Sequence, residues 1–174
     1  MNKLFKNNSE VNKSSSVKLS SHHLLAIEGM QKTEIQKLLD RADYFANLDK
    51  HADTKYLSGY VVLNVFFENS TRTRVSFELA ARRLGAEVIN ISLINSSIKK
   101  GESLLDTAST LNAKKPDLLI VRHPHSGAPL LFAEYLSCSI INAGDGRHEH
   151  PTQALLDALT IKRRIGYLEG LKIS

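Results

Sequence analysis

The sequence contains one cysteine and no long apolar run. Cys138 is that cysteine, so a single chain can form neither an internal disulfide nor a thiolate metal cluster, and a lone thiol is typical of a reducing compartment. No apolar stretch approaches the roughly 18 residues that a membrane-spanning helix needs. Residues 1–20 also lack the apolar segment of a secretory signal. We therefore expect a cytoplasmic protein without membrane association.

The composition is that of an ordinary globular chain. Hydrophobic residues make up 42% and charged residues 24%, values that are usual for soluble domains. A length of 174 residues suffices for one domain with its own core. Lys and Arg outnumber Asp and Glu by 23 to 18, which gives a net charge of +5. This mild excess is compatible with nucleic acid, an acidic surface or a small anionic substrate, and charge alone does not choose among them.

Short β-rich runs alternate with longer helical patterns along most of the chain. Residues 1–20 are rich in Asn, Ser and Lys, so we predict a disordered tail there. Apolar residues that recur at three and four predict an amphipathic helix over 33–47. The predicted strands are 60–67, 87–93, 117–121 and 139–142, and the helices that follow them are 75–84, 103–112, 129–136 and 152–165. Repeated βαβ units predict an α/β fold, a doubly wound parallel sheet of about four strands flanked by helices. Ligands bind such sheets beyond the carboxyl ends of the strands.

The first predicted strand leads into hydroxyl and arginine side chains: Ser70, Thr71, Arg72, Thr73 and Arg74. Ser and Thr are good N-caps, but the Glu that a capping box places three positions later is absent. Cations at a helix N-terminus cost about 0.3 to 1 kcal/mol each, whereas a charge-assisted hydrogen bond to an anion returns about 1.5 to 3 kcal/mol. Amides, hydroxyls and a guanidinium together favour a bound phosphate over a simple cap. Since the P-loop pattern and GxGxxG are both absent, a small phosphate ester or anhydride is a better candidate than a nucleotide.

Two further strand ends carry candidate side chains. Arg122 follows strand 117–121, where an arginine is most often a solvated surface residue. His150 precedes Pro151, which suits the first position of a helix, so the imidazole lies at or beside an N-cap. The positive helix end should lower the pKa of His150 and keep it neutral near pH 7, able to donate a hydrogen bond to a carbonyl oxygen. A plain capping role stays open as an alternative.

Metal binding is the other alternative for these histidines. His123 and His125 stand two residues apart, as do His148 and His150. Metal sites on helices usually set such ligands at i and i+4, and no helical pattern here does so. We therefore predict no metal site.

The order and spacing of several motifs resemble those of aspartate carbamoyltransferase catalytic chains. These motifs are FENSTRTRVSFE, KKGES, the VRHP around Arg122, and NAGDGRHEHPTQALLD, and the resemblance extends from Leu24 to the last residue. STRTR and HPTQ also occur in ornithine carbamoyltransferases, so they identify only the superfamily. NAGDG, at 142–146, and KGE, at 100–102, are similar to the aspartate branch.

The resemblance implies a carbamoyl-phosphate site. Its residues would be Ser70, Thr71, Arg72, Thr73, Arg122, His150 and Gln153, with Ser96 and Lys100 supplied by the neighbouring subunit of a trimer. The 70–73 segment would hold the phosphate, and Thr73 would also reach the carbonyl oxygen. Arg122 would bridge phosphate and carbonyl, His150 would polarise the carbonyl, and Gln153 would hold the amino group. Arg72, Thr73, Arg122 and His150 would thus be catalytic, with no metal or organic cofactor.

The implied reaction transfers the carbamoyl group to the amine of L-aspartate, a step of de novo pyrimidine biosynthesis. Residues 21–152 would form the carbamoyl-phosphate-binding domain and residues 153–170 an inter-domain helix. Residues 171–174 look like the first strand of an aspartate-binding domain, whose substrate-binding arginines have no counterpart in these 174 residues. The family also implies a homotrimer and allows regulatory or other pathway subunits.

Three rival functions stay open. An ornithine carbamoyltransferase would share the anion site, and a non-catalytic fragment could bind phosphate alone. A basic nucleic-acid-binding module is disfavoured, because the basic residues are spread out with little aromatic interleaving.

Overall fold

The computed structural model describes residues 19–49, 52, 54–93 and 103–173. Its strands are β1 (Val61–Phe66), β2 (Glu87–Ser92), β3 (Leu118–His123) and β4 (Ser139–Asp145). Its helices are α1 (Lys32–Ala46), α2 (Thr71–Arg83), α3 (Leu104–Asn112), α4 (Ala128–Tyr135) and α5 (Pro151–Ile165). The strands pair in parallel in the order β2-β1-β3-β4. The predicted α/β class with a four-stranded parallel sheet is therefore confirmed.

The strand order creates a switch point beside β1. The chain runs outward from β1 to β2, then crosses back to place β3 on the other side of β1. Connections on the two sides of such a point leave in opposite directions, so a crevice opens at the carboxyl ends of the two central strands. The 70–74 segment follows β1 at this end of the sheet, and Arg122 belongs to β3.

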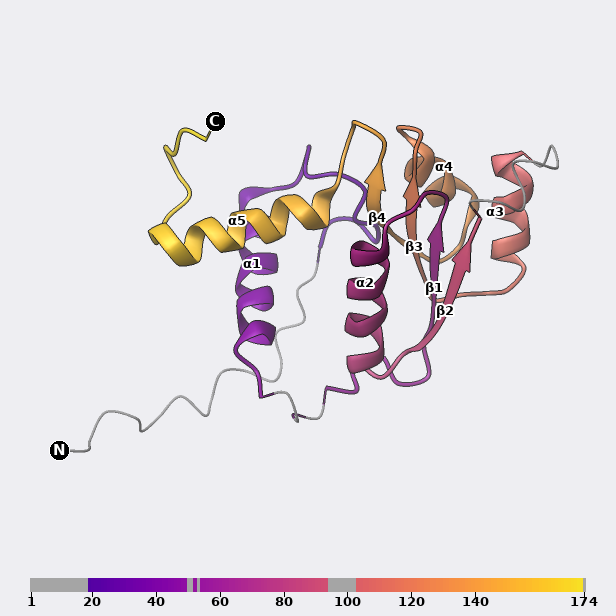
Figure 1. The fold of residues 1–174 in the computed structure, drawn as a ribbon, viewed down its shortest axis with the longest axis horizontal. Helices are drawn as coiled ribbons and strands as arrows, with labels where there is room; N and C mark the ends of the chain where they lie inside the picture. Colours follow the sequence, from indigo (N-terminus) through magenta and orange to yellow (C-terminus); the bar gives the residue numbers. More distant parts are fainter. Residues whose placement is uncertain (1–18, 50–51, 53, 94–102, 174) are drawn as a thin grey trace.

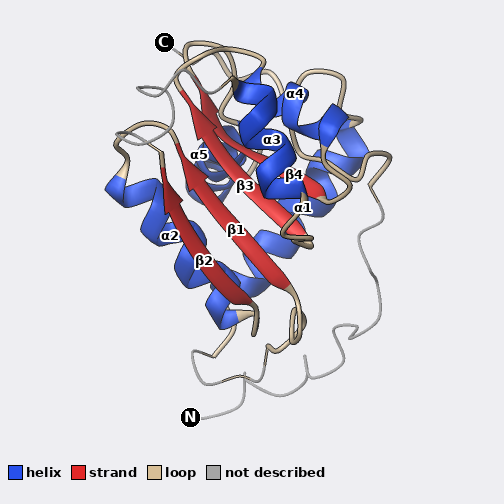
Figure 2. Ribbon diagram, turned by 90° about the vertical axis from the view of Figure 1, so that its right-hand side faces the viewer, coloured by secondary structure: helices blue, strands red, loops and turns tan. Residues whose placement is uncertain are grey.

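Helices cover both faces of the sheet. In Figures 1 and 2, α1, α2 and α5 lie on one side of the strands, and α3 and α4 lie on the other. Alternate residues of β1 supply the two cores, because successive side chains of a strand point to opposite faces. Val62 and Phe66 pack in the core that contains Ala81 of α2. Leu63 and Val65 pack in the core formed with α3 and α4.

Three differences from the predicted element boundaries affect the site. Helix α2 begins at Thr71 rather than at residue 75, because apolar periodicity does not detect a first turn made of hydroxyls and arginines. Strand β4 continues beyond residue 142 to Asp145, which pairs with His123 across an irregularity in the β3 register. Strand β3 likewise continues beyond residue 121 to His123, so Arg122 lies within it rather than after it.

The described part of the chain begins beside the free edge of β4. Leu24 forms a parallel bridge with Ile141, and its amide donates to the Ile140 carbonyl at 2.8 Å. Residues 1–18 of the predicted tail lie outside the described residues, and the amide of Ser20 contacts the Glu34 carboxylate. Among described residues, no helix is long and apolar enough to span a membrane, and no three or more His, Cys, Asp or Glu side chains are grouped to hold a metal.

Candidate functional site

Helix α2 begins with two arginines and no acidic residue in its first turn. Ser70 is the N-cap, with φ −155°, and it makes no side-chain capping bond. The first turn contains no acidic residue, while Arg72 and Arg74 both lie in it. Arg72 is exposed. A helix start with this charge distribution is electrostatically suited to an anion, as the sequence predicted.

A small polar hollow of about 30 Å³ lies against this helix start. Its lining residues are Phe66, Glu68, Asn69, Ser70, Thr71 and Arg74. Three of the predicted cradle residues therefore line it, and Glu68 places a carboxylate in the same wall. Sequence reasoning did not identify Glu68, although it lies within the FENSTRTR motif.

The sheet holds the first turn of α2 through a buried amide. Asn64, in the middle of β1, is fully buried, and its Nδ2 donates to the Arg74 carbonyl at 3.1 Å and to Asn90 Oδ1 at 2.8 Å. Since a buried polar bond to the sheet resists displacement, the cradle backbone is tied to the strand that precedes it. The Oδ1 of Asn64 makes no hydrogen bond among the described residues.

Arg122 links the connection that follows β1 to strand β4. Its Nε donates to Glu68 Oε1 at 2.6 Å, and its Nη1 donates to the Ala143 carbonyl at 3.0 Å. The side chain is 23% exposed. The alternative of a freely solvated surface arginine is therefore wrong. The guanidinium is held at the switch point, where it can present N–H donors to an anion.

Gly144 allows Arg122 and His150 to lie close together. A Cβ on Gly144 would be 2.7 Å from Arg122 Nη1 and 3.3 Å from His150 Cδ2. The first of these distances is shorter than real Cβ contacts, and φ at Gly144 is +118°, which other residues rarely adopt. A glycine is thus required where the arginine, the imidazole and the β4 backbone meet. The NAGDG motif contains this glycine, but the motif alone does not identify Arg122 and His150 as the side chains that lie against it.

His150 is the N-cap residue of α5 and is partly buried. Its side chain makes no capping hydrogen bond, so the plain capping alternative is wrong. Burial lowers the pKa of His150, and the nearby Arg122 cation lowers it further, while Asp157 acts in the opposite direction. The direction agrees with the predicted one, and burial is its largest cause, followed by Arg122. A neutral imidazole near pH 7 can donate a hydrogen bond from one nitrogen and accept at the other.

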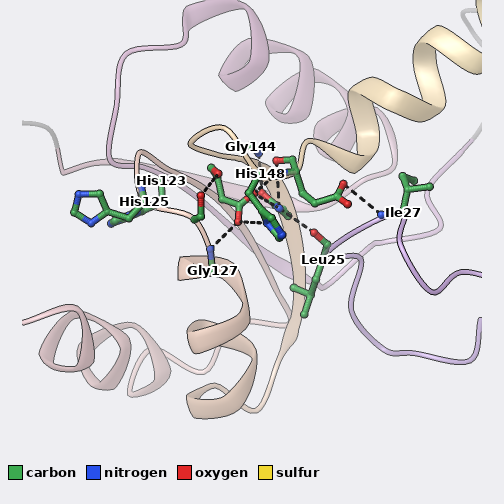
Figure 3. Close-up of polar contacts among 11 residues, drawn as sticks. Leu25, Ile27, His123, His125, Gly127, Gly144 and His148 are labelled. Atoms are coloured by element: carbon green, nitrogen blue, oxygen red, sulfur yellow. Dashed lines mark hydrogen bonds and ion pairs between the residues drawn. The ribbon is translucent and has the colours of Figure 1, made fainter.

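A buried carboxylate, that of Asp145, organises the loop between β4 and α5. Figure 3 shows polar contacts in this region, with Gly127, Gly144 and His148 labelled. Asp145 is 2% exposed and accepts from the Gly127 amide at 2.8 Å, the Glu149 amide at 2.8 Å and Asn142 Nδ2 at 3.1 Å. His148 Nδ1 lies 3.0 Å from Asp145 Oδ2, the oxygen that also accepts from the Gly127 amide. Asp145 lies within the NAGDG motif, but the sequence alone did not indicate a role for it.

The predicted site residues divide into three groups. The structure brings the 70–74 segment, Arg122 and His150 to the carboxyl end of the sheet. Gln153 lies in the first turn of α5, where its Nε2 donates to Asp157 Oδ1 at 2.9 Å. Ser96 and Lys100 lie outside the described residues.

The chain is similar to known carbamoyltransferases over most of its length. Residues 22–163 match the family described as aspartate/ornithine carbamoyltransferase, carbamoyl-P binding domain. The aspartate carbamoyltransferase catalytic subunit of Rhodospirillum rubrum is 60% identical over 154 residues, which are 87% of this chain and 48% of that protein. The corresponding subunit of Dinoroseobacter shibae is 59% identical over 160 residues, 90% of this chain and 50% of that protein. The chain thus spans about half the length of these relatives.

Solved structures show the same likeness. The catalytic subunit of M. jannaschii aspartate transcarbamoylase superposes with a TM-score of 0.79 at 45% identity, covering 87% of this chain and 50% of that one. Aspartate transcarbamoylase from Trypanosoma cruzi, in complex with carbamoyl phosphate and aspartate, gives a TM-score of 0.77 at 38% identity, covering 86% of this chain and 46% of that one.

Proposed function

The chain belongs to the aspartate/ornithine carbamoyltransferase family, and we propose that it supplies the carbamoyl-phosphate site of an aspartate carbamoyltransferase. The observation that carries this proposal is the meeting of Arg122 and His150 at Gly144, beside the positively charged start of α2. One cation, one neutral imidazole and a helix N-terminus suit a substrate with both a phosphate and a polarisable carbonyl. The resemblance found in the sequence agrees with the family and with the names of the relatives.

In the proposed reaction, the amine of L-aspartate attacks the carbamoyl carbon of carbamoyl phosphate. A tetrahedral intermediate forms, and the C–O bond to phosphate breaks to give N-carbamoyl-L-aspartate and phosphate. The departing phosphate accepts the proton that the amine loses. Donors aimed at a developing charge in a site that excludes water are typically worth about 3 to 4 kcal/mol each. Catalysis would therefore depend on positioning and electrostatics, without a metal or organic cofactor.

Each site residue has a proposed role. Ser70, Thr71, Arg72 and Thr73 would bind the phosphate. Thr73, Arg122 and His150 would stabilise the oxyanion, and Gln153 would bind the carbamoyl amino group. Binding by Gln153 requires its amide to exchange Asp157 for substrate. Ser96 and Lys100 would come from the neighbouring subunit of a homotrimer, with Lys100 assisting departure of the phosphate.

We assign the aspartate branch because the similar curated proteins are aspartate carbamoyltransferases. Ornithine carbamoyltransferase is the alternative within the family, and an assay of a complete enzyme with both amino acids separates the two.

Residues 21–152 would be the carbamoyl-phosphate-binding domain, 153–170 the inter-domain helix and 171–174 the start of the aspartate-binding domain. Exposed apolar side chains on and after α5, including Leu156 and Tyr167 at 57% each, support a covered position for that helix. The same proposal includes a cytoplasmic location and allows association with regulatory or other pathway subunits.

Isothermal titration of carbamoyl phosphate, and separately of inorganic phosphate, into the purified chain tests the proposal. Arg72→Ala should weaken binding about 10- to 100-fold, since a hydrogen bond to a charged group is worth about 1.5 to 3 kcal/mol. Arg83→Ala is the matched control, because it removes the same charge from the last turn of the same helix. Equal binding by Arg72→Ala and the unaltered chain would contradict the proposed phosphate site. Binding of nucleic acid with a steep salt dependence, and without competition by carbamoyl phosphate, would favour the basic binding module instead.

A further inference from the structure

Asp145 is a buried charged residue that the proposed reaction does not use. Each of its oxygens faces two donors. Oδ1 faces Asn142 Nδ2 and the Glu149 amide, and Oδ2 faces the Gly127 amide and His148 Nδ1. These donors come from β4, from the N-cap of α4 and from the loop that leads to α5. One carboxylate therefore accepts hydrogen bonds from three segments, and Ser126 Oγ adds a bond to the Asp145 carbonyl at 3.4 Å.

The loop between Asp145 and Glu149 is closed by a pair of hydrogen bonds. The Asp145 amide donates to the Glu149 carbonyl at 3.0 Å, and the Glu149 amide returns a bond to Asp145 Oδ1 at 2.8 Å. The next amide, that of Gly146, donates to the His123 carbonyl at 3.0 Å, which ties the loop to β3. His150 follows Glu149 directly. The direction in which the imidazole leaves the loop thus depends on a backbone that Asp145 fixes.

The other end of the loop positions the partner of His150. Gly144 precedes Asp145, and its amide donates to Asn142 Oδ1 at 2.8 Å. Arg122 Nη1 donates to the Ala143 carbonyl and lies against Gly144. The same short segment therefore determines where both Arg122 and His150 lie.

We propose that Asp145 is a positioning residue that holds the His150 imidazole against Arg122. The positioning of the ring is argued from the hydrogen bonds of the loop. Its effect on catalysis rests on the proposed function. The carboxylate is suited to this role because all four surrounding groups can donate to it. Burial raises the pKa of Asp145, but hydrogen bonds from Gly127, Asn142, Glu149 and His148 outweigh burial and lower it. The group is therefore ionised at neutral pH.

Asp145→Asn tests the proposal with almost no change in shape. An amide presents N–H₂ where the carboxylate presented an oxygen, so either the Gly127 or the Glu149 amide would face a donor. The readout is the pKa of the His150 ring, measured by NMR on ligand-free, ¹⁵N-labelled protein. If Asp145 positions the ring, the variant releases His150 from Arg122 and from burial, and its pKa rises toward the ordinary value.

The competing roles of Asp145 predict other outcomes. If it acted only as a nearby negative charge, neutralising it would lower the pKa of His150, because the imidazolium would lose a favourable partner. If it only stabilised the fold, the pKa would stay unchanged while the unfolding temperature fell. Either result would overturn the proposal. The charged groups that act on His150 are Arg122 and Asp157, and Asp145→Asn alters neither side chain.

Two controls accompany the titration. Asp117→Asn removes another carboxylate that accepts from a backbone amide, that of Val61 at 2.7 Å, at the opposite end of the sheet. This variant should lower stability and leave the His150 pKa unchanged. Phosphate binding by the unaltered chain is measured separately, so failure of the proposed function and failure of the positioning role give different results.

Hydrogen exchange on the unaltered protein tests the same role if Asp145→Asn does not fold. The amides of Gly127 and Glu149 should exchange about 100-fold or more slowly than in an unstructured chain, because each is bonded to the Asp145 carboxylate. Exchange of the Glu149 amide at the unstructured rate would show that the loop is not held, and the proposal would be wrong.

Discussion

At the scale of single residues, the fold keeps two histidines neutral by burying them. His123 is 3% exposed, its ring centroid lies 4.5 Å from that of Phe67, and its Nδ1 accepts from the His125 amide. Burial lowers the pKa of His123, with a further contribution from His125, and burial likewise lowers that of His150. A residue that is neutral in the native protein but protonated in the unfolded chain links stability to pH.

The sign of this linkage predicts that acid weakens the fold before the carboxylates titrate. As pH falls below about 6.5, unfolded histidines gain protons that native His123 and His150 do not, so the free energy of unfolding falls. The loss continues until pH passes their lowered native pKa values. The slope is at most about 1.4 kcal/mol per pH unit for each histidine. Urea unfolding between pH 7.5 and 5.5 measures it.

His123→Phe should reduce that slope while keeping an aromatic ring beside Phe67. The unaltered chain and the variant should show equal slopes between pH 7.5 and 8.5, where histidine is neutral in both states. An unchanged slope below pH 6.5 in the variant would contradict a native His123 held neutral by burial.

At the scale of secondary-structure elements, the first turn of helix α2 carries charges that oppose the helix dipole, although it lies at the carboxyl end of the sheet where ligands bind. Arg72 opposes the positive helix end, whereas Arg82 and Arg83 in the last turn complement the negative end. This arrangement is understandable if the first turn serves a ligand rather than stability.

Arg72→Glu should therefore stabilise the protein and abolish phosphate binding. Replacing a cation by an anion at the helix start is worth about 0.5 to 1 kcal/mol at low ionic strength. Arg83→Glu, at the other end, should destabilise by a similar amount and leave binding intact. Thermal unfolding and phosphate titration of both variants measure the two effects. A less stable Arg72→Glu protein would mean that the arginine serves the helix itself.

The elements that were predictable from sequence are those built on apolar periodicity. Strand β1 is apolar except for Asn64, β3 begins with four consecutive apolar residues, and α1 shows apolar spacing of three and four. The first turn of α2 was missed because Thr71 to Arg74 contains no apolar residue, and the end of β4 was missed because Gly and Asp are poor strand formers. The site residues that lie within recognisable motifs, such as STRTR and HPTQ, were predictable from the sequence. The contact of Arg122 with Glu68, 54 residues away in sequence, depends on strand order and was not.

At the scale of the whole molecule, the described residues form one sheet with a core on each face and one functional end. The switch point lies between β1 and β3, and the groups proposed to bind carbamoyl phosphate reach it from the connections after β1 and β4 and from the end of β3. Parallel strands align their carboxyl ends, so residues between 68 and 150 converge there without a long loop. The described residues thus include the groups proposed for carbamoyl phosphate, apart from Ser96 and Lys100.

We predict that the 174-residue chain binds carbamoyl phosphate but does not form carbamoyl aspartate by itself. The resemblance places the aspartate-binding arginines beyond the part of the relatives that this chain matches, which is about half of their length. A polypeptide limited to residues 1–174 would not include those arginines to position the amine, and positioning supplies about 7 to 11 kcal/mol of the barrier reduction in well-oriented reactions. The purified chain with both substrates should therefore give no product in an assay that uses a full-length aspartate carbamoyltransferase catalytic subunit as the positive control. Product that appears with the unaltered chain and disappears with Arg122→Ala would contradict the prediction, because it would show that these residues bind and orient both substrates.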